Sequence, residues 1–151
     1  MPHDITPLLA AAEKVCIRNG TQLTPLRRDV LGLILHATTP LTAYQLLDQL
    51  KTLRQSAVPP TIYRALEFLL QNHLIHKIER LNAFVPCVEA THHHDDAQFL
   101  ICKKCCAVQE IEDHDISHAL ARAAAAHGFV TSRAMVELDG LCAACAAATP
   151  A

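Results

Sequence analysis

No stretch of this 151-residue chain stays apolar over the roughly 18 consecutive residues that a membrane-spanning helix needs, so we expect a soluble protein with no membrane partner. The opening residues, MPHDITPLLAAAEK, also lack the basic segment, apolar segment and cleavage site of a secretory signal. We therefore expect a cytoplasmic location. In that reducing compartment, seven cysteines are better explained as metal ligands or free thiols than as disulfides.

The chain also lacks the local signatures of two kinds of enzyme. None of its clustered histidines is followed two residues later by glutamate, the H-x-E arrangement that gives a zinc deaminase its ligand and general acid/base. No βαβ pattern surrounds its CxxC pairs, which disfavours a thioredoxin-like redox role. We expect no enzyme, and keep a zinc-dependent hydrolase as the alternative of a different class.

Charge is divided unevenly along the chain. Residues 1–80 contain nine Lys/Arg against six Asp/Glu, a net charge of +3, whereas residues 81–151 contain four against nine, a net charge of −5. A basic front half and an acidic, His- and Cys-rich back half indicate that nucleic-acid contacts lie in front and metal binding behind.

The front half has the pattern of several helices followed by a hairpin. Thr24 before Pro25 predicts a helix start, and Thr42 with Gln45 predicts a capping box. Helical periodicity covers residues 7–19, 25–37, 41–53 and 56–73, with Leu46, Leu47, Leu50 and Leu53 as the buried stripe of the third helix, and strand-like segments cover 74–78 and 83–87. This order is typical of a winged helix-turn-helix, whose second helix enters the major groove of DNA.

The candidate recognition helix, residues 56–73, has a polar face that suits DNA contacts. Tyr63 and Arg64 lie in its first turn beside Thr61, where recognition helices touch base edges. Phosphate contacts are expected from the basic residues of neighbouring elements, namely Arg27, Arg28 and Lys77. The alternative is a helical subdomain whose polar face meets only water.

The back half predicts a small α+β unit with a four-cysteine zinc site. Strands are expected over residues 97–102, 107–112 and 129–140, with an Ala-rich helix over 114–128. Two CxxC pairs, Cys102 with Cys105 and Cys142 with Cys145, are spaced for one tetrahedral zinc. Four thiolates leave no open position on the ion, so its role should be structural.

A second metal site is expected around the hairpin. A turn centred on Leu81 and Asn82 would place His76 directly opposite Cys87, and cross-strand partners are close enough to share one ion. A further imidazole from the cluster His92–His94 and the carboxylate of Glu110 would complete a tetrahedron. The thiolate favours zinc over Fe(II) or Mn(II). Three later histidines either form a third site or only decorate the helix, namely His114, His118 and His127.

Several segments together resemble the ferric uptake regulator superfamily, and most closely its zinc uptake regulator branch. These segments are LTPLR, PPTIYRALEFL, LIHKIE, the histidine cluster, FLICKKC and GLCAAC. The resemblance implies an α+β homodimer with a winged helix-turn-helix DNA-binding domain over residues 1–83 and a zinc-binding α/β dimerisation domain over 84–151. It also implies a repressor that holds two Zn²⁺ per subunit, one structural and one regulatory. Zinc loading would let it bind palindromic double-stranded operator DNA and repress zinc-uptake genes.

The resemblance extends to single positions. Cys102, Cys105, Cys142 and Cys145 match the structural zinc ligands. His76, Cys87, His94 and Glu110 match the regulatory ligands, with His93 as a rival to His94. Tyr63 and Arg64 match the recognition-helix pair, and Cys106 stands where the family usually has glycine. An iron or peroxide sensor of the same superfamily is the alternative within the family, and Cys87 argues against it.

Overall fold

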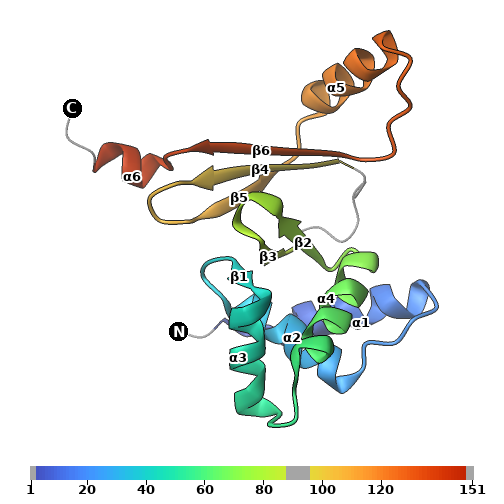
Figure 1. Cartoon of the computed structure of the whole chain (residues 1–151), viewed down its shortest axis with the longest axis vertical. Coiled ribbons are helices and arrows are strands. Elements are labelled where there is room, and N and C mark those ends of the chain that lie inside the picture. The colour runs from blue at the N-terminus through green and yellow to red at the C-terminus, as the bar shows by residue number, and fades with distance from the viewer. Residues whose placement is uncertain (1–2, 88–95, 149–151) are drawn as a thin grey trace. The chain divides into compact units, whose positions relative to one another are not determined.

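The computed structural model describes residues 3–87 and 96–148, which fall into two compact units, Met1–Ala90 and Thr91–Ala151. The first unit is mainly helical and the second is a small sheet with two helices, so the predicted α+β class is confirmed (Figure 1). The elements of the first unit are α1 (Thr6–Arg18), α2 (Pro25–His36), β1 (Leu41–Thr42), α3 (Ala43–Leu53), α4 (Pro59–Gln71), β2 (Ile75–Ile78), the 3₁₀ turn η1 (Glu79–Leu81) and β3 (Ala83–Pro86). Those of the second are β4 (Asp96–Cys102), β5 (Val108–Ile111), α5 (His114–Ala126), β6 (Ala134–Gly140) and α6 (Ala143–Ala147). Across the described residues, no helix is both long and apolar enough to cross a membrane.

Helices α2 and α3 begin where their capping residues predict. The Thr24 hydroxyl accepts a hydrogen bond from the backbone N–H of Arg27 at 3.5 Å, with Pro25 in the first helical position. Thr42 and Gln45 form the capping box, because the Gln45 N–H donates to Thr42 Oγ1 at 3.2 Å and Gln45 Oε1 accepts from the Thr42 N–H at 2.9 Å.

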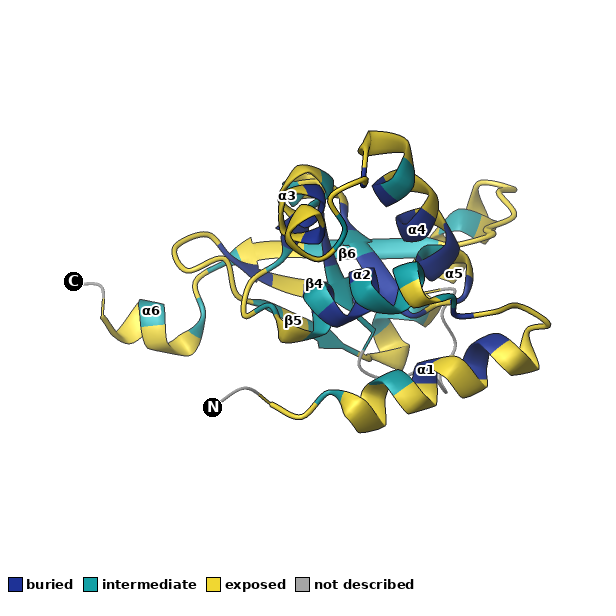
Figure 2. Cartoon of the chain, turned by 90° about the horizontal axis from the view of Figure 1, so that it is seen from below, coloured by how far each residue is buried: buried dark blue, intermediate teal, exposed yellow. Residues whose placement is uncertain are grey.

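The apolar stripes of the helices make the core of the first unit (Figure 2). Fully burying one large apolar side chain contributes roughly 1.5–3 kcal/mol to stability. The several apolar side chains buried on α4 therefore stabilise its packing by several times that amount. The predicted burial of Leu53 is wrong, since 59% of this residue is exposed at the last position of α3. The buried residues of α4 are Ile62, Ala65, Leu66, Phe68 and Leu69.

The wing is a three-stranded antiparallel sheet in the order β1-β3-β2. Its hairpin closes at the pair Ile78 and Ala83, and His76 faces Val85. The predicted pairing of His76 with Cys87 is therefore wrong by two residues. The reason is that η1 fills the connection and Asn82 ends it in the left-handed region at φ 48°, which moves the centre of the turn toward the N-terminus.

The second unit is a three-stranded mixed sheet in the order β5-β4-β6 (Figure 1). β4 pairs antiparallel with β5 and parallel with β6, which starts at Ala134 and not at residue 129 as predicted. Phe129 and Val130 are 66% and 91% exposed in the connection between α5 and β6. The short helix α6 was not predicted separately from the second CxxC pair.

Candidate metal centres and nucleic-acid interface

Four cysteine sulfurs meet within the second unit in the arrangement that zinc requires. One Sγ from each of Cys102, Cys105, Cys142 and Cys145 lies within 4.8 Å of all the others. Cys105 Sγ and Cys142 Sγ are 3.8 Å apart. Thiolates on a tetrahedral zinc, each about 2.3 Å from the ion, stand about 3.8 Å apart. The donor set and its spacing therefore fit a structural zinc.

Two tight turns bring these sulfurs together. Cys102 is the last residue of β4, and its carbonyl accepts from the Cys106 N–H at 3.0 Å, which closes the first turn. Cys142 is the N-cap residue of α6, and its carbonyl accepts from the Ala146 N–H at 2.8 Å. The Lys103 N–H donates to the Gly140 carbonyl at 2.9 Å, so backbone hydrogen bonding joins the two turns directly.

Hydrogen bonds give the four thiols unequal pKa values. The N–H groups of Cys105, Cys142 and Lys104 bond to the Cys102 sulfur and lower the pKa of this thiol to about 6. The hydrogen bond between the Cys145 and Cys142 thiols, and then burial, raise the pKa of the Cys145 thiol to about 12. A cation is what allows all four groups to be thiolates together near neutral pH.

Cys106 follows the first turn in a conformation that favours glycine. Its φ is 60°, in the left-handed region, and its side chain is exposed. This conformation redirects the chain after Cys106, so that the Ala107 carbonyl accepts from the Cys102 N–H at 2.9 Å. The departure from the expected glycine therefore leaves the turn intact and adds backbone strain.

The wing brings together two of the predicted regulatory ligands, His76 and Cys87. His76 lies in β2 and is 6% exposed, and Cys87 directly follows β3, with its N–H bonded to the Leu74 carbonyl at 3.0 Å. A ligand atom of His76 lies within 4.8 Å of Cys87 Sγ. Although Cys87 is two residues beyond Val85, the direct partner of His76, strand alternation keeps both on one face. This diagonal pair offers one nitrogen and one sulfur, a donor set that suits zinc.

Of the two other predicted regulatory ligands, His94 and Glu110, only Glu110 lies within the described residues. His94, like His92 and His93, lies outside the described residues. Glu110 lies in β5, half-buried, and pairs with Phe99 of β4. The three later histidines are exposed, and within residues 3–87 and 96–148 none of them belongs to a possible metal group; they are His114, His118 and His127.

The first turns of α4 present the predicted DNA-reading residues. Thr61 is half-buried, and its hydroxyl accepts from the Val58 N–H at 3.2 Å, so it acts as part of the helix cap. Tyr63 is 61% exposed, and Arg64 is exposed without an ion pair among the described residues. An unpaired cation beside an aromatic ring at a helix start is well suited to a base edge and its phosphate.

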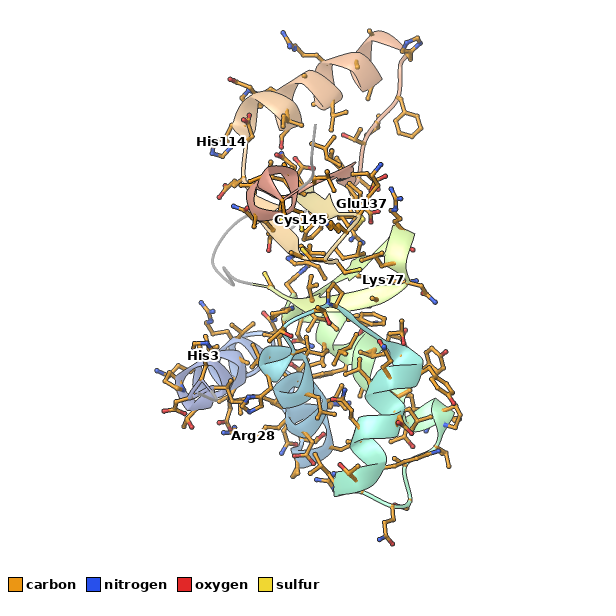
Figure 3. The ribbon with its side chains drawn as sticks, turned by 90° about the vertical axis from the view of Figure 1, so that its left-hand side faces the viewer. His3, Arg28, Lys77, His114, Glu137 and Cys145 are labelled. Carbon is orange, nitrogen blue, oxygen red and sulfur yellow. The ribbon has the colours of Figure 1, made fainter. Side chains whose placement is uncertain are left out.

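The other predicted basic contacts are engaged within the first unit. The Arg27 guanidinium lies 3.7 Å from the centre of the Phe68 ring and donates to the Gln22 carbonyl at 2.8 Å. Arg28 on α2 pairs with Glu13 at 3.7 Å, and Lys77 on β2 pairs with Glu79 at 3.4 Å (Figure 3). Arg28 and Lys77 would exchange weak surface pairs for phosphate, whereas Arg27 would lose packing.

Sequence patterns did not predict one exposed aromatic residue on the helix-turn-helix pair, α3 and α4. Tyr44, in the first turn of α3, is 82% exposed. The signal for it was present, because Tyr44 falls between the two residues of the capping box and off the stripe formed by Leu46, Leu47 and Leu50. Both tyrosines of the chain thus stand exposed at the starts of the helix-turn-helix helices.

The fold and these sites define a class, a winged-helix protein with a metal-binding α/β unit. The chain belongs to the ferric uptake regulator family, whose model matches residues 18–139. It is 39% identical over 138 residues to the zinc uptake regulation protein of Escherichia coli K12, covering 91% of this chain and 81% of the relative.

Solved structures show the same likeness over nearly the whole chain. One is described as a zinc uptake regulator complexed with zinc and DNA; its TM-score is 0.91 at 38% identity, covering 96% of this chain and 97% of that one. Another, the holo form of the regulator XcZur, has a TM-score of 0.85 at 43% identity, covering 93% and 98%.

Proposed function

We propose that this protein is a zinc-responsive transcriptional repressor that binds palindromic operator DNA as a zinc-loaded homodimer and represses zinc-uptake genes. The observation that carries the proposal is the TM-score of 0.91, at 38% identity, to a zinc uptake regulator solved with zinc and DNA. The exposed Tyr63 and Arg64 at the start of α4 support the DNA-binding part. The proposal assigns no catalytic residue.

We propose two zinc ions per subunit. The structural ion would be held by Cys102, Cys105, Cys142 and Cys145, whose sulfurs already have suitable separations. Bound zinc would supply a divalent charge that holds its ligands as thiolates and cross-links the segments that carry them. Cys102, with three backbone N–H groups on its sulfur, provides the ligand that is best prepared.

The regulatory ion is proposed to take His76, Cys87, His94 and Glu110 as ligands. The close approach of His76 to Cys87 on the wing supports this set. His76 belongs to the first unit and Glu110 to the second, so a shared ion would restrict how the two units can be arranged. Shifting such an equilibrium from 1:99 to 99:1 requires a preference of about 5.5 kcal/mol for one arrangement, within reach of a zinc site.

For DNA we propose base contacts from Tyr63 and Arg64, with Thr61 setting the start of the helix. Tyr44 is added because, like Tyr63, it is exposed in the first turns of its helix. Arg28 and Lys77 are the proposed phosphate contacts, since each holds only a surface pair that phosphate can replace. Arg27 is proposed to reach phosphate only if its contact with Phe68 opens.

The test is binding of the full-length protein to a labelled zinc-uptake promoter fragment, followed by fluorescence anisotropy while free zinc is raised in a chelator buffer. We expect tight binding that appears only as zinc rises and that iron and manganese do not restore. Binding restored by iron would support the iron-sensor alternative instead. Binding that ignores metal, or no binding, would contradict the proposed function.

A further inference from the structure

Asn72 ends the candidate recognition helix with a side chain that is almost fully buried. It is the C-cap residue of α4 and is 4% exposed. Its backbone N–H and its side-chain Nδ2 both donate to the Phe68 carbonyl, at 3.1 and 2.9 Å. The last turn of the helix is therefore closed twice by one residue.

The other end of the same amide reaches the C-cap of α1 and the loop that follows it. Asn72 Oδ1 accepts from the Thr21 hydroxyl at 2.8 Å and from Asn19 Nδ2 at 3.2 Å. The hydroxyl has one proton, and its contact with the Cys16 carbonyl is longer at 3.1 Å, so the bond to Asn72 is the better one. We call these three side chains, Asn72, Asn19 and Thr21, the Asn72 latch.

A second contact ties the same stretch of chain to α4. The Arg27 guanidinium lies over the Phe68 ring and donates to the Gln22 carbonyl. The loop between α1 and α2 is thus attached to the last turn of α4 through both Asn72 and Phe68. The latch constrains the orientation of α4 as well as adding packing contacts, because hydrogen bonds require a narrow range of angles between donor and acceptor.

We propose that Asn72 is a positioning residue for operator recognition, acting by fixing the orientation of α4 against α1 and the loop that follows it. Arg64 lies about 12 Å from Asn72 along the helix axis, at about 1.5 Å per residue. A small tilt allowed at the last turn therefore displaces the first turns enough to disturb a base contact. This inference rests on the proposed function.

The fold should tolerate loss of the latch. In Asn72→Ala the backbone cap to Phe68 remains, and the freed side chains of Thr21 and Asn19 are exposed and can bond to water. In Thr21→Val the backbone bond from the Thr21 N–H to the Cys16 carbonyl, 2.8 Å, remains. Thr131→Val is the matched control, since it removes the hydroxyl of an exposed threonine between α5 and β6, outside the proposed DNA contacts and ligands.

The experiment compares zinc-loaded full-length wild type, Asn72→Ala, Thr21→Val, the double variant and Thr131→Val, with protein concentrations corrected for the folded fraction. Affinity is measured for the operator and for a scrambled duplex. We expect each single latch variant to bind the operator about tenfold more weakly, a loss of about 1.4 kcal/mol of binding free energy. Binding of the latch variants to the scrambled duplex, and operator binding by Thr131→Val, should match wild type.

The double variant separates positioning from independent damage. If Thr21 acts only through its hydrogen bond to Asn72, the double variant loses no more affinity than Asn72→Ala alone. Additive losses, equal losses on both duplexes, or wild-type operator affinity in Asn72→Ala would overturn the latch while leaving the proposed function standing. Failure of the wild type itself to bind the operator would overturn both.

Discussion

Cys106 allows the first cysteine turn to form but strains its backbone. The turn needs a residue at φ 60°, and any L-residue there has its Cβ too close to the backbone, at a cost of roughly 1–2 kcal/mol. The sequence identified the unusual position because Cys106 stands where the related pattern has glycine. Its left-handed conformation is known only from the structure, where the chain after Cys106 turns back so that the Ala107 carbonyl bonds to the Cys102 N–H.

Cys106→Gly should raise the free energy of unfolding of the zinc-loaded protein by up to about 1 kcal/mol, since relief of strain exceeds the entropy that glycine adds to the unfolded chain. Urea unfolding measures the change. Cys106→Ala is the control that removes the thiol without changing the strain, and it should unfold like the wild type. A less stable Cys106→Gly protein would show that the left-handed conformation costs nothing here.

Arg64 is the exposed cation of α4 that a base contact would use. Arg64→Ala should weaken operator binding by about 1–3 kcal/mol if the guanidinium reads a purine edge. The matched control is Arg122→Ala on α5, which removes the same charge from an exposed helix of the second unit. Anisotropy titrations at two salt concentrations measure both. Equal small losses for the two variants would mean that Arg64 contributes only charge.

At the scale of elements, local rules worked best where the chain closes its own hydrogen bonds. The capping residues Thr24 and Thr42 located the starts of α2 and α3, because an N-cap satisfies donors a few residues away. The predicted strand pairing in the wing was wrong because it depended on the shape of the turn. The alternation of apolar residues does not reveal a 3₁₀ turn followed by Asn82 at positive φ. The start of β6 failed similarly, since Phe129 and Val130 resemble strand residues but lie exposed before it.

Helix α6 should depend on the proposed structural zinc. It has five residues, far below the length at which an isolated helix is stable in water, and none of them is buried. Removing zinc with a strong chelator should therefore abolish protection of the amides of Ala146 and Ala148 in hydrogen exchange. The amides of α2 and α4, buried in the other unit, should keep theirs. Protection of α6 without zinc would show that the cysteine turns hold it unaided.

At the scale of the whole molecule, the sequence predicted both kinds of site but not how each is built. Two CxxC pairs were enough to predict the four-cysteine cluster, because short spacing forces both sulfurs of a turn toward one point. His76 and Cys87 were predicted as a pair for a wrong reason, direct opposition. They are close because strand alternation places a diagonal neighbour on the same face.

Cys87→Ser should separate the two proposed metal functions. The variant should keep its fold and the zinc bound by the four cysteines, and lose zinc-dependent operator binding, because a hydroxyl is a far weaker zinc ligand than a thiolate. Metal content and anisotropy titration measure the two effects. Cys106→Ser, a change at an exposed cysteine outside both ligand sets, should respond to zinc like the wild type. Normal zinc-dependent binding by Cys87→Ser would remove Cys87 from the regulatory ligands.

The parallel pairing of β4 with β6 has a consequence for how the protein reaches its folded state. These strands are joined through β5 and α5, so their ladder is non-local and forms only after a long segment of chain has been brought back on itself. A zinc ion bound by the two cysteine turns would hold together the same strand ends, at Cys102 and Gly140, and would restrict the unfolded chain. Newly synthesised chains should therefore fold faster when zinc is plentiful, and the supply of working protein would itself follow the metal.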